Sequence, residues 1–127
     1  METQKILFSI IESPSHPNFS STYSRLGFKE VIISSMRKAI SQLKKIAPDF
    51  IVAEFCYAYS SNYSAIHTSN LDVLLYSLKK YSPETKVIVL VKKDELEYVD
   101  HIQELFPLHA ILSYPISEAQ INAALKQ

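Results

Sequence analysis

The chain is poor in the residues that several kinds of functional site require. Its single cysteine, Cys56, excludes an intramolecular disulfide and a cysteine-based zinc site. Gly27 is the only glycine, so the polar run 13–22 has none of the glycines that let a phosphate loop approach its ligand. The histidines have no metal-ligand spacing. The sequence therefore predicts no metal site, and we expect no cofactor.

Charge of one sign and long apolar runs are also missing. Thirteen Lys and Arg residues balance thirteen Asp and Glu residues, for a formal net charge of +0. Nucleic-acid binders usually carry a basic excess or stripe, so we expect no nucleic-acid partner. No run approaches the roughly 20 apolar residues of a membrane span, and no small-residue cleavage site follows the N-terminal apolar run. We expect a cytoplasmic protein without a membrane partner.

What the chain does have is a regular alternation of two kinds of segment. Hydrophobic residues make up 47% of its 127 residues, which is enough for one globular domain over 1–127. Short apolar runs rich in β-branched residues predict strands that are buried on both faces. These runs are 5–11, 30–34, 50–55, 86–91 and 109–114.

Segments with helical spacing of apolar residues lie between these runs. The predicted helices are 36–47, 71–78, 96–106 and 117–125, with a weaker one at 19–26. We expect Gly27 to end the weak helix, and Ser117 with Gln120 to form a capping box for the last one. Strands that alternate with helices imply parallel pairing, hence an α/β three-layer sandwich. The flavodoxin-like strand order 2-1-3-4-5 is one of several orders that periodicity alone leaves open.

Four stretches resemble the response-regulator receiver domains, the CheY-like family. They are 5–12, 26–55, 70–91 and 110–125, so the resemblance covers nearly the whole chain. It implies a five-stranded parallel sheet of order 2-1-3-4-5 and a role in two-component, or phosphorelay, signalling. It also implies a cis Tyr114–Pro115 bond.

The positions that would bind magnesium in this family carry other residues here. The resemblance places Ile10 and Ile11 where receivers have a pair of acidic residues at the end of the first strand. Isoleucine cannot bind a hard cation that requires oxygen ligands. Glu12 matches the acidic residue that often follows the pair, but a single carboxylate is a poor substitute for the two acids of the pair.

The remaining phosphorylation positions have also changed. The resemblance places Glu54 at the phospho-acceptor aspartate, Val91 at the hydroxyl residue, Ile111 at the switch aromatic and Tyr114 at the lysine, while Pro115 is retained. Glutamate is one methylene longer than aspartate, which displaces the carboxylate from the in-line geometry of phosphoryl transfer. The sequence thus resembles a degenerate receiver, or pseudo-receiver. Glu54 is then either a permanent mimic of the phosphorylated state or, as we favour, a polar residue left at a solvent-exposed strand end.

Two functions are compatible with this sequence, and neither is enzymatic. The first is a signalling domain that acts by phosphorylation-independent protein–protein interaction. Its partner would be a kinase, an output protein or a second copy of the chain. The resemblance implies that the partner binds the face formed by the fourth helix, fifth strand and fifth helix, and a homodimer would use the same face. The alternative is a sensor that binds a flavin, a quinone or a nucleotide in the crevice at the carboxyl ends of the strands.

The stretch 55–69 departs most from the family and is rich in tyrosine. Tyr57 and Tyr59 alternate with smaller residues, and Tyr63 follows. A simple continuation of the third strand would also explain tyrosines at every second residue. Long loops in compact domains are often functional, and tyrosine is enriched in interface cores. We therefore predict that Tyr57, Tyr59 and Tyr63 contact a partner or cover a ligand.

Overall fold

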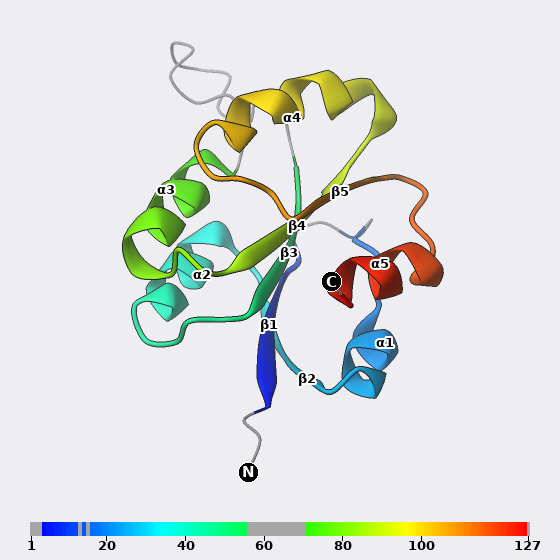
Figure 1. Cartoon of the computed structure of the whole chain (residues 1–127), viewed down its shortest axis with the longest axis horizontal. Helices are drawn as coiled ribbons and strands as arrows, with labels where there is room; N and C mark the ends of the chain where they lie inside the picture. The colour runs from blue at the N-terminus through cyan, green and yellow to red at the C-terminus, as the bar shows by residue number, and fades with distance from the viewer. Residues whose placement is uncertain (1–3, 13, 15, 56–70, 127) are drawn as a thin grey trace.

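The structure is a computed structural model of the chain, and it describes residues 4–12, 14, 16–55 and 71–126. Strands and helices alternate along these residues (Figure 1). The strands are β1 (Lys5–Ile10), β2 (Phe28–Ile33), β3 (Phe50–Glu54), β4 (Lys86–Val91) and β5 (Ala110–Ser113). The α-helices are α1 (Ser20–Arg25), α2 (Met36–Leu43), α3 (Asp72–Tyr81), α4 (Leu96–Gln103) and α5 (Glu118–Leu125), and a 3₁₀ turn, η1 (Lys93–Glu95), precedes α4.

The five strands form one parallel sheet in the order β2-β1-β3-β4-β5. This is the flavodoxin-like order, so the structure selects one of the orders that the sequence pattern left open. Helices cover both faces of the sheet. One apolar cluster joins the sheet to α2, α3 and α4, and a second joins it to α1 and α5. The fold is therefore the predicted three-layer α/β sandwich.

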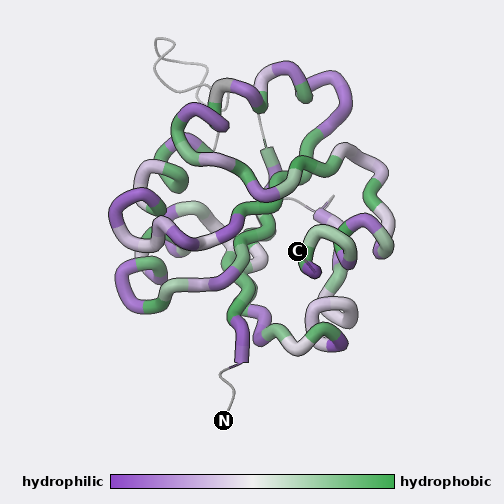
Figure 2. The backbone as a smooth tube through the Cα atoms, in the orientation of Figure 1, coloured by the Kyte–Doolittle hydropathy of each residue, from purple (hydrophilic) through white to green (hydrophobic). Residues whose placement is uncertain are grey.

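Apolar residues concentrate along the strands and polar residues along the outer surfaces of the helices (Figure 2). Strand β3 is the middle strand of the sheet, between β1 and β4. Every residue of β4 from Val87 to Val91 is fully buried. Continuous apolar runs are typical of strands covered on both faces. Among the described residues, no helix combines the length and apolar character that a membrane span requires.

Local signals set the ends of several elements. Gly27 has φ +90°, a left-handed conformation that glycine adopts without steric cost, directly after α1. The side chain of Ser35 accepts a hydrogen bond from the backbone N–H of Lys38 at the start of α2. The capping box of Ser117 and Gln120 is present at α5, as predicted. The cis Tyr114–Pro115 bond is confirmed as well.

Several boundaries differ from the sequence prediction, including the ends of α3 at Tyr81 and of α4 at Gln103. Strand β2 and helix α2 show the cause. Strand β2 begins at Phe28 rather than at residue 30, because Phe28 pairs with Lys5 of β1 although the polar Lys29 and Glu30 interrupt the apolar run. Helix α2 ends at Leu43 rather than near residue 47. The periodicity of apolar residues does not show which backbone groups form hydrogen bonds, so it does not locate either boundary exactly.

Candidate functional site at the carboxyl ends of the strands

The predicted site residues lie at one edge of the sheet. All five strands are parallel, so their carboxyl ends meet there. Ile10, Glu54 and Val91 are the last residues of β1, β3 and β4. Tyr114 follows the end of β5, and its backbone N–H donates to the carbonyl of Val91 across 3.0 Å. The fold thus brings together positions that are more than 100 residues apart in sequence.

A buried histidine–glutamate pair occupies the centre of this edge. The Nδ1 atom of His16, in the loop between β1 and α1, lies 2.9 Å from Oε2 of Glu54. The side chain of His16 is 0% exposed and that of Glu54 is 9% exposed. Burying a carboxylate is costly unless a hydrogen-bond partner or opposite charge compensates for its lost hydration. His16 supplies that compensation and fastens the loop to the end of β3.

This geometry corrects one expectation about Glu54. We favoured a leftover polar residue at a solvent-exposed strand end, whereas Glu54 is buried and bound by His16. In the sequence, we considered the histidines as possible metal ligands. That interpretation missed a contact between residues 38 positions apart. The sequence did contain a signal for this contact. A histidine follows the first strand, and in a parallel sheet of this order the loop after the first strand lies beside the end of the third strand.

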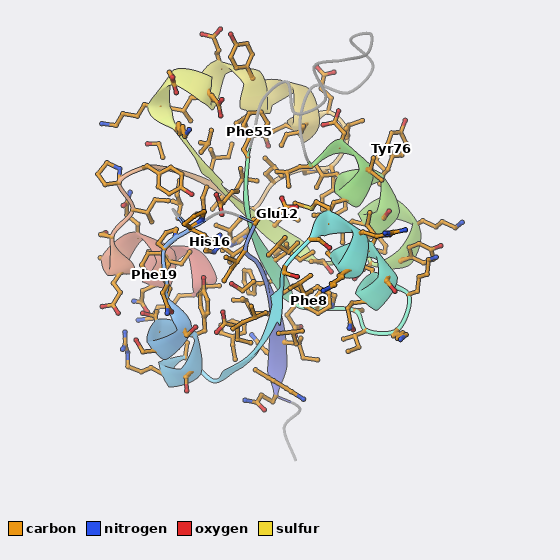
Figure 3. All side chains as sticks on the ribbon, turned by 180° about the vertical axis from the view of Figure 1, so that it is seen from behind. Phe8, Glu12, His16, Phe19, Phe55 and Tyr76 are labelled. Carbon is orange, nitrogen blue, oxygen red and sulfur yellow. The ribbon has the colours of Figure 1, made fainter. Side chains whose placement is uncertain are left out.

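The residues after β1 are unsuited to hold magnesium. Ile10 is buried in the cluster beneath α2, α3 and α4, and the backbone N–H of Ile11 donates to Ile33 in β2. Oε2 of Glu12 accepts a hydrogen bond of 3.3 Å from the backbone N–H of Met36, at the start of α2. Figure 3 shows Glu12 and His16 on this side of the molecule. Within the described ranges, no group of three His, Cys, Asp or Glu residues could hold a metal ion.

The positions at the ends of β4 and β5 are apolar or aromatic. Val91 is fully buried, and Ile111 packs against the same cluster. Tyr114 is half-buried and packs against the opposite cluster, that of α1 and α5, while Pro115 is exposed. These side chains carry no cation that would neutralise a phosphoryl group.

A second polar contact near this edge joins α1 to α5. The hydroxyl of Thr22, which is fully buried, donates to Oε2 of Glu118 across 2.9 Å. Thr22 and Glu118 are 96 residues apart, and no sequence motif points to the contact. It holds together the two helices on one face of the sheet. Tyr57, Tyr59 and Tyr63 lie outside the described residues, and their role stays a prediction.

Three cavities in the described part of the molecule lie away from the His16–Glu54 pair. One of about 440 Å³ is lined by Lys5, Gly27 and Lys126, among other residues. Lys5 and Phe28 begin β1 and β2, so this cavity lies at the opposite edge of the sheet. Smaller hollows adjoin the start of β4 and the outer side of β2. None of them includes Glu54 or His16.

The chain matches no family model and no curated protein. Its fold does match those of solved structures. A response regulator receiver protein from Sinorhizobium medicae is 24% identical, with a TM-score of 0.72 over 99% of this chain and 94% of that one. CheY4 of Vibrio cholerae is 14% identical, with a TM-score of 0.73 over 98% of both chains.

A third match is a receiver with a metal ion. The receiver domain of the sensor histidine kinase PA1611 from Pseudomonas aeruginosa, described with magnesium in its active site cleft, is 11% identical. Its TM-score is 0.71, over 98% of this chain and 96% of that one. At these identities the likeness establishes the fold. The chain has the CheY-like receiver fold.

Proposed function

We propose that this chain is a signalling domain of the two-component type that acts through protein–protein contacts and does not accept a phosphoryl group. The receiver fold supports the signalling class. The buried His16–Glu54 pair is the observation that supports independence from phosphorylation. Its carboxylate stands at the position that matches the phospho-acceptor, yet it is shielded from solvent and bound to a histidine.

Phosphoryl transfer to Glu54 would require several groups that this edge of the sheet does not supply. A donor must reach the carboxylate in line, and cations must neutralise the charge on the transferred oxygens. Ile10 and Ile11 offer no side-chain oxygen to a magnesium ion, and Val91 and Tyr114 offer neither a small hydroxyl nor a cation. Attack by Glu54 would also have to break its contact with His16.

Incubation with acetyl phosphate and magnesium tests this proposal directly. We expect the intact mass of the protein to stay unchanged under conditions in which a phosphorylatable receiver gains one phosphoryl group. The variant Glu54→Asp should also remain unmodified, because the shorter acid does not restore the metal ligands. A stoichiometric adduct on the wild-type chain that hydroxylamine removes would refute the proposal.

The face formed by α4, β5 and α5 is the proposed contact surface for a protein partner. Strand β5 is an edge strand, and all four of its residues are half-buried rather than buried. Leu96, at the start of α4, is 41% exposed. An exposed leucine beside an open edge strand gives this face apolar area and unpaired backbone groups that a protein partner could cover.

Affinity capture with two matched variants tests this surface. Leu96→Arg alters the proposed face, whereas Ile32→Arg alters an aliphatic residue, 63% exposed, on the opposite edge strand. We expect Leu96→Arg to lose a kinase or output protein that the wild type and Ile32→Arg both retain, with all three proteins equally stable. Equal recovery by all three proteins would place the contact elsewhere.

A further inference from the structure

Exposed lysines gather at the edge of the sheet where the strands begin, opposite the His16–Glu54 pair. Helices α2 and α3 pack against each other and on the same apolar cluster (Figure 1). Helix α2 leads into β3 and α3 leads into β4, so both helices end at this edge. The exposed lysines here, which we call the lysine edge, come from the two helix ends and from the starts of two strands. They are Lys44, Lys45, Lys79, Lys80, Lys5 and Lys86.

The lysine doublets at the ends of α2 and α3 have no ion-pair partner in the part of the chain that the structure describes. No carboxylate in those ranges forms an ion pair with either doublet. Helix α2 contains no acidic residue, and the single acid of α3, Asp72, is buried. The ammonium group of Lys80 lies 5.3 Å from the ring centroid of Tyr81, which is 37% exposed. The charges of both doublets therefore face solvent, beside an exposed aromatic ring.

Helix electrostatics explains only part of this excess of lysine. Cations at the carboxyl end of a helix interact favourably with the helix dipole, which accounts for the two doublets. Lys5 and Lys86 instead begin β1 and β4, each of which has a neighbouring strand on both sides. They do not protect an open edge strand, which is a common role of lysine in sheets. A surface that attracts an anionic ligand accounts for all of these lysines together.

A cavity of about 260 Å³ opens within the lysine edge. Lys5 and Lys86 line it, and Pro48 and Phe50 give it apolar wall. Two segments contribute most of the lining: residues 47–50, which follow the doublet of α2, and residues 82–86, which follow the doublet of α3. The cavity and the two doublets therefore form one continuous surface, with a partly apolar hollow among cations.

We propose that the lysine edge binds an acidic segment of a partner protein, and that the segment places an apolar side chain in the cavity. The lysines attract the carboxylates of the segment, and such complementary charge speeds and orients association. The surface lies at the other end of the strands from Leu96, which begins α4 at the carboxyl edge. The inference rests neither on the absence of phosphoryl transfer nor on the α4–β5–α5 face.

The lining of the cavity favours a peptide over other polyanions. Asp49 and Glu84 line it together with the lysines, and Oδ2 of Asp49 accepts a hydrogen bond of 2.8 Å from the backbone N–H of Ile6. A nucleic acid carries a phosphate at every nucleotide and would set phosphates against these two carboxylates. A lipid surface is too broad to enter the cavity. A peptide can hold its acids over the doublets and still present an apolar side chain or a backbone N–H to the cavity.

Charge reversal at the helix ends tests this surface. The first variant carries Lys79→Glu with Lys80→Glu. The control carries Lys92→Glu with Lys93→Glu, an exposed doublet at the carboxyl end of β4, and it changes the net charge by the same amount. Fluorescence anisotropy measures binding of a labelled glutamate-rich peptide with a central leucine, and of a matched peptide with glutamine in place of glutamate. Labelled oligothymidine and phosphatidylserine vesicles serve as the other polyanions, and circular dichroism verifies that each protein is folded.

The proposal predicts a distinct pattern of affinities. Wild type and control should bind the glutamate peptide with dissociation constants within about twofold of each other, whereas the Lys79, Lys80 variant should bind about tenfold or more weakly. A second variant, Lys44→Glu with Lys45→Glu, should show the same loss. Binding should weaken as salt rises, and the glutamine peptide should not bind.

Three results would overturn the proposal. The first is a wild type that does not bind the glutamate peptide. The second is a control that loses as much affinity as the two helix-end variants, because net charge alone would then explain the binding. The third is tighter binding of oligothymidine or of the vesicles than of the peptide, which would assign the lysine edge to a different polyanion.

Discussion

Replacing His16 tests the energetic role of the buried pair at the strand ends. His16→Leu replaces the imidazole with an apolar side chain of similar size. The change removes the Nδ1 atom that lies 2.9 Å from Oε2 of Glu54. Removing one partner of a buried hydrogen bond between ionisable side chains typically destabilises a protein by about 1–3 kcal/mol. We expect the upper end, about 3 kcal/mol, because the side chain of Glu54 is only 9% exposed and that of His16 is 0% exposed.

The double variant His16→Leu, Glu54→Leu should recover most of this loss. Replacing both partners with apolar residues of similar size removes both polar groups of the hydrogen bond, so its stability should lie within about 1 kcal/mol of the wild type. Glu54→Leu alone should lie between the two, because it removes the group that Nδ1 of His16 contacts but leaves the loop otherwise unchanged. The sum of the single changes should therefore exceed the double change by at least about 1 kcal/mol, the non-additivity expected of residues in contact.

Urea unfolding followed by circular dichroism measures all four proteins. For a chain of 127 residues, a loss of 3 kcal/mol lowers the melting temperature by about 11 °C, from the average unfolding entropy per residue. An unchanged slope of free energy against urea will show that the unfolded states are comparable. If His16→Leu costs less than about 0.5 kcal/mol, or the single changes are additive, the pair does not hold the loop.

Two further predictions concern α1 and its end. The hydroxyl of Tyr23 is buried and has no hydrogen-bond partner among the described residues, so Tyr23→Phe should leave the stability at neutral pH equal or raise it by up to about 1 kcal/mol. Burial, aided by the charge of Glu30, raises the pKa of Tyr23 above its ordinary value of about 10. The unfolded chain therefore loses this proton at a lower pH than the folded chain, and the free energy of unfolding falls as pH rises above about 10. In urea titrations at alkaline pH, Tyr23→Phe should show a smaller fall than the wild type. An identical pH profile for the two proteins would contradict this prediction. Gly27→Ala should cost about 1–2 kcal/mol because φ is +90° although the space around it is open, and a thermal melt that matches the wild type would show that the turn relaxes.

The sequence determined the layers of this protein because they depend on local patterns. Continuous β-branched runs predicted β1, β3, β4 and β5, and amphipathic spacing predicted the helices between them. Gly27 and the Ser117–Gln120 pair predicted ends that the structure confirms. The resemblance to receivers selected the strand order and the cis Tyr114–Pro115 bond, which periodicity alone does not reveal.

Tertiary structure decided the state of the candidate site. A strand-end glutamate is compatible with either exposure or burial, and only the position of the β1–α1 loop beside β3 shows that His16 covers Glu54. The contact between Thr22 and Glu118 likewise depends on which elements are neighbours in space. The spacing of apolar residues specifies which face of each helix or strand is apolar, because that spacing involves only residues within the same element. Contacts between distant polar residues depend on the chain's path through the whole sheet, and that path is a property of the tertiary structure.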